Sequence, residues 1–441
     1  MNRSIKAILI IWGASHCWLT LPAQELLTLS QAIATGLENN FDIIIRKNDA
    51  LIAENDNAPG NAGFLPTLNL SAAQGTNISN TYQERATGSV IDIKGATNRT
   101  LNAGLQLNWT LFDGFSMFVN KNSLGVLERM SETEARLTIE STVSSIILAY
   151  YGIVQQQKLI RVLEDAVALS MDRKFIMESK LSLGSGSELM LLQSTVDLNA
   201  DSVNLLREMA NLERFRADFN RLLSLDPEIR FVPADSLIPG EMLSYKDLLE
   251  RAKNQNTGLQ LARYSLDLDN LYLKNLQSQR YPRLNLNASY GYNQLNSQTG
   301  FLEYNRSYGP SFGLSLSYAL FDGFNVNRNI KNARIEISSG ETMLRSADLG
   351  LHNEIYKLFV DYETNRNMVE IEEVNQGVAK RNVDVAYEKY RLGAFSDIEL
   401  RETQKKYIDA QYQLLLSQYQ VKRAEIELLR LSGGMERFLS D

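Results

Sequence analysis

The spacing of apolar residues along the chain changes between a helical and an alternating pattern. Residues 115–183 and 324–392 lack proline, are rich in Leu, Ile, Glu and Lys, and repeat apolar side chains at helical spacing. A continuous helix of that length would extend about 100 Å at about 1.5 Å per residue, which is typical of long coiled assemblies. Four shorter helices are predicted, over residues 29–60, 187–224, 244–278 and 396–431.

Between the helices the pattern has a period of two. Two hairpins are predicted, over residues 67–111 and 283–320, and in each strand apolar or aromatic residues alternate with small polar ones. This alternation is typical of a membrane barrel strand, with lipid on one face and water on the other. An antiparallel sheet lying on a soluble core would show the same alternation.

Four strands are too few to close a barrel. Open strand edges in lipid would leave backbone groups unpaired at a cost of several kcal/mol each. If the strands cross a membrane, several copies must therefore share one barrel. Two copies would give eight strands with an interior filled by side chains, and three would give twelve strands with room for water.

The chain is an internal repeat. Residues 28–70 align without gaps on residues 244–286, and Leu-Phe-Asp-Gly-Phe at 111–115 returns at 320–324. We therefore expect a first repeat over residues 24–225 and a second over residues 242–441, joined by a linker, 226–241, that contains proline.

The N-terminus has the features of a secretory signal. Arg3 and Lys6 precede a short apolar stretch, and cleavage after Ala23 would remove residues 1–23. Cys17 is the only cysteine, and the residues before it fit a lipid-attachment motif poorly.

Composition argues against most catalytic classes. One cysteine and two histidines exclude disulfides and Cys/His zinc sites, and the formal net charge of −7 disfavours nucleic-acid binding. The sequence contains no phosphate-binding glycine loop and no cluster of metal-ligand residues. We therefore expect that the protein is not an enzyme and that it has no cofactor and no metal site.

The order of elements and the paired Leu-Phe-Asp-Gly-Phe motifs resemble the TolC family of outer-membrane efflux proteins, over essentially the whole mature chain. The resemblance implies a mainly α fold with membrane β: a homotrimer with a 12-stranded outer-membrane β-barrel continued by a 12-helix periplasmic α-barrel. It implies as partners a periplasmic adaptor protein and an inner-membrane pump of RND or ABC type. The linker would lie in the equatorial region.

Six residues mark the joins between helix and strand. Pro66 and Pro282 occupy equal positions where helix becomes strand, and proline favours extended geometry in the residue before it. Asp113-Gly114 and Asp322-Gly323 mark the return to helix, where Asp can cap the helix and Gly permits a sharp turn. We interpret all six as architectural hinges.

Two Leu-Gly pairs lie at the predicted helix reversals. Leu183-Gly184 aligns with Leu392-Gly393, and both match the family's tip motifs, which dock onto the adaptor. The alternative is a turn that only reverses the helix, since glycine commonly ends helices.

The resemblance also suggests a periplasmic gate. Glu399 and Glu402 match an acidic pair that lines the family's entrance, and Tyr390 matches a tyrosine that helps to close it. Threefold symmetry would make two carboxylate rings that attract cations, and crowding would raise their pKa values. The alternative is a solvated helix face. Phe395 stands where a known member has arginine, so the closing contacts must differ.

Three functions remain open from the sequence. The first is a passive exit duct of an efflux system, and the second is the outer-membrane component of a type I protein secretion system. The third, a soluble periplasmic coiled-coil scaffold, would explain the helices but not the alternating segments.

Overall fold

The computed structural model describes residues 25–238, 240, 242–299 and 302–438. The predicted signal peptide and Cys17 lie outside the described residues. The chain forms two compact units, and each takes segments from both sequence repeats. Unit 1 contains residues up to 36, 146–238 and 368–419, and unit 2 contains residues 37–145, 239–367 and those from 420 onward.

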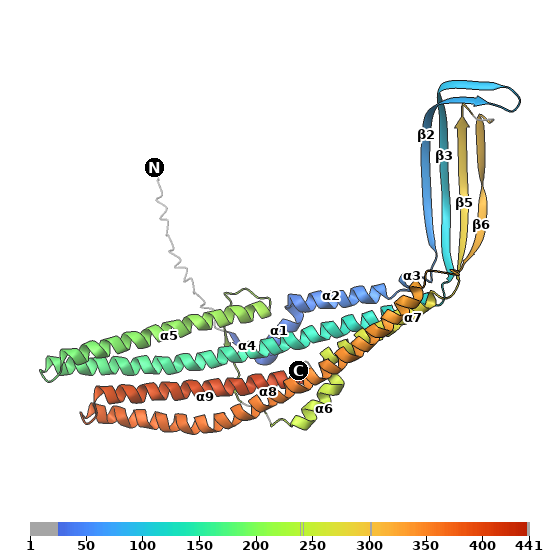
Figure 1. Cartoon of the computed structure of the whole chain (residues 1–441). Coiled ribbons are helices and arrows are strands. Elements are labelled where there is room, and N and C mark those ends of the chain that lie inside the picture. The colour runs from blue at the N-terminus through green and yellow to red at the C-terminus, as the bar shows by residue number, and fades with distance from the viewer. Residues whose placement is uncertain (1–24, 239, 241, 300–301, 439–441) are drawn as a thin grey trace, which may run out of the picture. The chain divides into compact units, whose positions relative to one another are not determined.

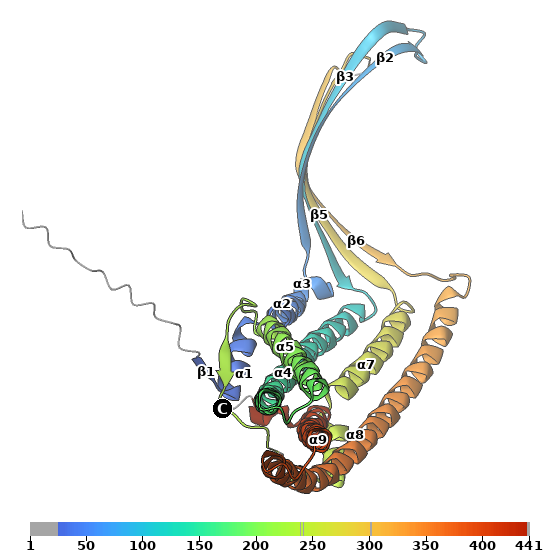
Figure 2. The same cartoon turned by 90° about the vertical axis from the view of Figure 1, so that its left-hand side faces the viewer.

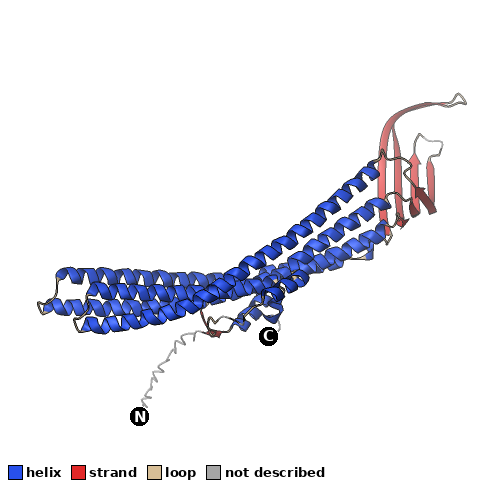
Figure 3. Ribbon diagram, turned by 60° about the horizontal axis from the view of Figure 1, so that its bottom comes forward, coloured by secondary structure: helices blue, strands red, loops and turns tan. Residues whose placement is uncertain are grey.

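Two long helices supply segments to both units. They are α4 (Ser116–Ser182) and α8 (Asn325–Arg391), each of 67 residues. Each is followed, after a tight turn, by a 35-residue helix: α5 (Glu188–Leu222) after α4 and α9 (Asp397–Leu431) after α8. Figures 1 and 3 show the unit 1 parts of these four helices lying side by side.

Unit 1 also holds a small parallel pairing of strands. β1 (Glu25–Leu27) pairs with β4 (Phe231–Pro233), so the predicted linker region is tied to the start of the described chain. The Tyr150 hydroxyl shares its one proton between Asp235 Oδ2 at 2.7 Å and the Leu27 carbonyl oxygen at 2.8 Å. The buried phenol thus holds both strands to α4.

Unit 2 contains one antiparallel sheet of four strands, in the order β2-β3-β5-β6. The strands are β2 (Thr67–Glu84), β3 (Val90–Phe112), β5 (Arg283–Ser297) and β6 (Tyr304–Ser317). Figure 2 shows the longer β2-β3 hairpin reaching beyond β5 and β6. A bulge next to Ser79 and Thr81 marks the start of this extension.

The helices of unit 2 precede or follow the strands. Besides the first part of α4 and of α8, they include several shorter elements: α2 (Phe41–Asp56), α3 (Pro59–Ala62), α6 (Tyr245–Gln255), α7 (Thr257–Ser278) and the 3-10 helix η1 (Gly434–Phe438). Helix α1 (Leu29–Asn39) precedes α2.

Two helices predicted as continuous are broken in the structure. The stretch 29–60 divides at Asn40, and the stretch 244–278 divides at Asn256. Both asparagines have extended backbone, and the side chain of each accepts from the next helix: Asn40 Oδ1 from the Ile43 amide at 3.2 Å, Asn256 Oδ1 from the Leu259 amide at 2.8 Å. Asparagine is a strong N-cap, so each starts a new helix.

Helix α4 contains an 18-residue window that is apolar enough to cross a membrane by length and composition alone. Half of that window is buried inside the protein, which is also typical of a core helix. Val143, Ile147, Tyr150 and Ile153 of α4 are all fully buried. Their burial accounts for this apolar stretch through packing.

Candidate functional site

The strand register separates two faces of the sheet. On one face, which we call the apolar face, Leu70 lies opposite Leu105, and Leu105 lies opposite Tyr290. Large apolar side chains there are exposed to an unusual degree, such as Leu70 at 77% and Phe312 at 79%. The apolar face is formed by Leu68, Leu70, Leu101, Leu105, Leu107, Trp109, Leu286, Tyr290, Tyr292, Tyr308, Phe312, Leu314 and Leu316.

The opposite face, the polar face, carries amides, hydroxyls and glycines. Its cross-strand neighbours bond to each other: the Ser289 and Ser311 hydroxyls lie 2.7 Å apart, and Thr110 Oγ1 donates to Asn285 Oδ1 at 3.1 Å. Its main members are Asn69, Ser71, Asn98, Asn102, Gln106, Asn108, Asn285, Asn287, Ser289, Asn293, Ser307, Ser311 and Ser315. One face suits lipid and the other suits water.

The Asp-Gly pairs occupy the strand-to-helix turns. Asp113 Oδ1 accepts from the Met117 amide at 3.1 Å, and Asp322 Oδ2 accepts from the Val326 amide at 2.7 Å. Gly114 and Gly323 have φ of 74° and 68°, the left-handed region that favours glycine. A β-carbon on Gly114 would lie 2.2 Å from the Ser278 carbonyl oxygen, so this turn also needs the missing side chain.

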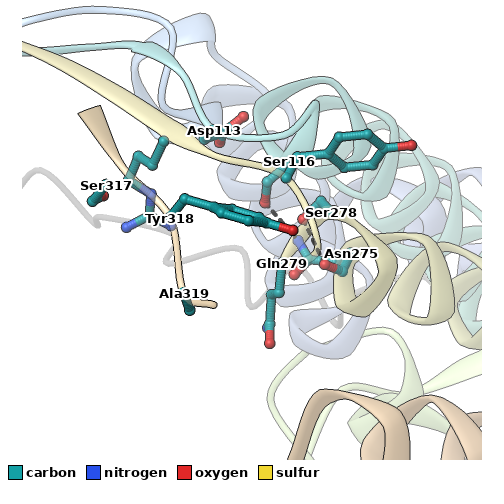
Figure 4. A pocket seen from close by; sticks show the side chains of 10 residues that line it. Asp113, Ser116, Asn275, Ser278, Gln279, Ser317, Tyr318 and Ala319 are labelled. Atoms are coloured by element: carbon teal, nitrogen blue, oxygen red, sulfur yellow. Dashed lines mark hydrogen bonds between the residues drawn. The ribbon is translucent and has the colours of Figure 1, made fainter. Parts of the chain in front are cut away.

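The first Asp-Gly turn borders a cavity of about 470 Å³ where the sheet joins the helices (Figure 4). Asp113, Ser116, Asn275 and Ser278 line it together with the end of β6. Asn275 donates to Ser116 Oγ at 3.0 Å, which connects α7 to the start of α4. This bond, and the bond from the Ser278 hydroxyl to the Asn275 carbonyl at 2.6 Å, help to fix the join between strand and helix.

The predicted prolines immediately precede strands. Pro66 comes before the first residue of β2, and Pro282 comes before the first residue of β5. The two β-hairpins therefore begin at equivalent positions of the two repeats.

The two tip turns have the same geometry. Gly184 and Gly393 have φ of 73° and 76°, and each donates its amide to a carbonyl three residues earlier at 3.0 Å. Leu183 and Leu392 are 81% and 82% exposed. Each turn thus exposes a leucine side chain at the equivalent position.

Glu399 caps its own helix. Its Oε2 accepts from the Ser396 amide at 2.9 Å and from the Ser396 hydroxyl at 2.6 Å, while Ser396 Oγ accepts from the Glu399 amide. This is a capping box at the start of α9. The hydrogen bonds from Ser396 lower the pKa of Glu399 in the single chain, the opposite of the direction expected for crowded carboxylates.

Glu402 and Tyr390 have contrasting surroundings. Glu402 is exposed and lies 3.9 Å from Lys405 Nζ. Tyr390 is buried against Met177, Ala386 and Leu400. Burial, followed by the charge of Asp397, raises the pKa of the Tyr390 hydroxyl above its ordinary value. Glu399 and Glu402 are therefore reachable from water, and the Tyr390 ring belongs to the core.

A buried ion network lies beside Tyr390. The side chain of Arg173 has no exposed surface and forms a double hydrogen bond with Asp397, at 3.0 and 2.7 Å, while Asp197 accepts from it at 3.2 Å. Burial alone would lower the pKa of Arg173, but the bonds and charges of Asp397 and Asp197 outweigh it and raise that pKa.

A second ion pair continues the network. Arg401 donates to both oxygens of Asp201, at 2.6 and 2.8 Å, and Asp201 also accepts from Ser170 at 2.6 Å. Gln404 donates to Ser170 Oγ at 3.2 Å. Helices α4, α5 and α9 are thus joined by charged groups inside the protein.

Comparison with known proteins supports the resemblance to outer-membrane efflux proteins. The model of a family described as "Outer membrane efflux protein" matches residues 248–434. The outer membrane protein TolC of Salmonella enteritidis is 23% identical over 370 residues, which cover 81% of this chain and 72% of that protein. The outer membrane efflux protein BepC of Brucella suis is 20% identical over 80% of this chain and 78% of its own length.

The chain is thus similar over most of its length to members of the TolC family of outer-membrane efflux proteins. Among solved structures, the CmeC outer membrane channel of Campylobacter jejuni is similar in fold, with a TM-score of 0.78 at 17% identity over 92% of this chain and 85% of CmeC. The predicted family, the TolC-like fold and the outer-membrane location with a periplasmic extension are confirmed. These similarities support an outer-membrane efflux duct.

The buried ion network was missed by sequence reasoning. Arg173 and Asp397 are 224 residues apart in the chain, so no local spacing pairs them. The available signal was a charged residue on an otherwise apolar helix face: Arg173 lies one turn before Met177, which is buried. A charge in such a position requires a partner, but only the fold identifies which one.

Proposed function

We propose that three copies of this chain form one exit duct of a tripartite efflux system. The observation that carries the proposal is the exposed apolar face on a sheet of only four strands. In water this face would drive aggregation, while in a bilayer it matches the lipid-facing band of a barrel.

The sheet has two edges that another copy would pair. β2 and β6 are the outer strands, so each offers one unpaired row of backbone groups. Pairing β6 of one copy with β2 of the next would remove every edge. The polar face favours three copies over two, because twelve strands leave an aqueous interior whereas eight strands fill theirs with side chains.

Exposed apolar stripes in unit 1 support the same assembly. α5 exposes Leu189, Leu192, Val196, Val203 and Leu206, and α8 exposes Ile371, Val374, Val378 and Val385, all by 46% or more. Both sets have the alternating three- and four-residue spacing of a coiled-coil seam. The neighbouring copies that close the barrel would also cover these seams.

The proposed docking site for a periplasmic adaptor is the pair of tip turns. Leu183 and Leu392 are exposed apolar side chains held at fixed positions by Gly184 and Gly393. An exposed leucine in a rigid turn is suited to the apolar groove of a helical hairpin. An inner-membrane pump of RND or ABC type would complete the system.

The proposed periplasmic gate consists of Glu399, Glu402 and Tyr390. The exposure of the two glutamates permits them to face an aqueous entrance, and the burial of Tyr390 places its ring in the core that positions α9. Pro66, Pro282, Asp113, Gly114, Asp322 and Gly323 act as hinges between duct segments. We assign the duct no catalytic role, in keeping with relatives named as efflux proteins.

Complementation tests adaptor docking. In a strain that lacks the duct and is sensitive to toxic compounds, the wild-type gene should restore resistance, and Leu183→Asp with Leu392→Asp should not. The matched control is Ser185→Asp with Ala394→Asp, which alters the same turns beside the leucines. Full resistance with both leucines replaced would contradict docking through the tips. Loss of a secreted protein with unchanged resistance would favour the type I secretion alternative.

A further inference from the structure

The polar face of the sheet is almost free of charge. Of the described residues that β2, β3, β5 and β6 place on this face inward of the bulge, only Arg283 carries a formal charge. The others are chiefly Asn, Gln, Ser, Thr and Gly. A face that needs only to be wetted could equally carry Asp, Glu, Lys and Arg, and the helices of this chain carry many.

Arg283 lies at one end of this face. It is the first residue of β5 and lines the same cavity as Asp113. Ser289 lies six residues farther along β5, about 20 Å away at about 3.4 Å per residue. That separation is about two and a half times the Debye length of about 8 Å at physiological salt, so the arginine contributes little potential at Ser289.

Charges on the apolar face have little effect on the middle of the polar face. Arg99 and Arg306 point from the apolar face near the outer end of the sheet. Ser311, the partner of Ser289, lies five residues from Arg306, or about 17 Å along the strand. The centre of the polar face is therefore electrically neutral and distant from fixed charges.

We infer that the barrel interior does not discriminate by charge: it passes cations, anions and uncharged solutes alike. Amides and hydroxyls both donate and accept hydrogen bonds, so they can solvate either sign of ion. Rings of charged side chains are what gives a pore its ion preference, and the described strands place none at the barrel centre. Selection by charge is left to the helical entrance and the pump. This inference rests on the proposed barrel.

The test measures local potential at one position inside the barrel. Ser289→Cys, in a chain whose only native cysteine is replaced by Cys17→Ser, is inserted in planar bilayers. A cationic and an anionic methanethiosulfonate reagent are added separately from the outer side, and the modification rate is followed by the change in conductance. We expect the ratio of the two rates to equal that of a free thiol in the same buffer within about twofold.

Two variants make the result decisive. Ala288→Cys, one residue along and on the apolar face, should show no conductance change with either reagent. Gln106→Glu combined with Ser289→Cys places a carboxylate directly across from the thiol, and the rate ratio should move toward the cationic reagent by about threefold or more. The introduced glutamate has nearly the same shape as Gln106 and differs from it mainly in its charge.

The outcomes separate the inference from the proposed function. A tenfold or larger departure from the free-thiol ratio in Ser289→Cys would overturn the neutral interior while leaving the barrel intact. Equal modification of Ser289→Cys and Ala288→Cys, or channels that never form, would overturn the barrel itself. The inference is supported if the ratio of the two modification rates in Ser289→Cys lies within about twofold of the free-thiol ratio and shifts when Gln106→Glu is added.

Discussion

The sheet of unit 2 and the helix ends of unit 1 are stabilised by opposite means. In the sheet, backbone ladders run between strands, and inward of the bulge the side chains on the polar face are neutral except for Arg283. Near the tips, buried charges join α4, α5 and α9 through Arg173, Asp397, Arg401 and Asp201. A strand ladder tolerates varied side chains, but a buried ion network depends on each member.

The largest expected effect comes from breaking the network. Asp397→Ala leaves Arg173 charged and buried, so we expect the helical structure to lose about 3–5 kcal/mol of stability. Chemical denaturation followed by circular dichroism measures it. The control is Glu402→Ala, which removes only an exposed pair with Lys405 and should change stability by less than about 1 kcal/mol. If the two substitutions lowered the free energy of unfolding equally, the buried network would add no more stability than an exposed ion pair.

The next effect tests the sheet faces. Leu314→Arg puts a charge on the apolar face, where it should cost up to about 2–4 kcal/mol, the value at the bilayer centre. Ser315→Arg, the adjacent residue on the polar face, should insert normally and make the channel more anion-selective. Membrane extraction and conductance measure both variants. If the two substitutions were equally tolerated, the assignment of the faces would be wrong.

A smaller effect distinguishes the two Asp-Gly turns. Gly114→Ala meets the Ser278 carbonyl in addition to an unfavourable φ, whereas Gly323→Ala meets only the φ penalty of about 1–2 kcal/mol. We therefore expect Gly114→Ala to unfold at the lower denaturant concentration. The reverse order would show that the close approach to Ser278 relaxes at little cost.

The smallest effect concerns the pH dependence of α9. The depressed pKa of Glu399 contributes stability that is present above its unfolded-state pKa and lost as pH falls through the folded-state pKa. Ser396→Ala removes the hydroxyl bond, the first-ranked cause of the lowered pKa, and keeps the backbone amide bond, so the carboxylate should protonate at higher pH. NMR titration of the Glu399 carboxyl carbon gives the midpoint in both proteins. An unchanged midpoint would mean that Ser396 does not set this pKa.

The elements were predictable because their signals are local. Helical spacing and alternation each act over a few residues, and the repeat showed the β-hairpins twice. The breaks at Asn40 and Asn256 had a readable signal, since asparagines at equal positions of two repeats are candidate N-caps. Because the helical spacing of apolar residues continues on both sides of each asparagine, each stretch was predicted as one helix.

The candidate sites were predictable only where a motif marks them. The tip glycines and Asp-Gly turns have local backbone requirements that sequence displays. The partner of Arg173 depends on how helices far apart in sequence pack. The bond between Ser396 and Glu399 belongs to a capping box, which can be recognised only once the start of the helix is known.

The number of chains per assembly tests the central claim most directly. Native mass spectrometry of the detergent-extracted protein should give three times the mass of the mature chain, because four strands per copy seal a water-filled barrel only when copies are joined. A stable, folded monomer that retains its sheet signal would contradict the account.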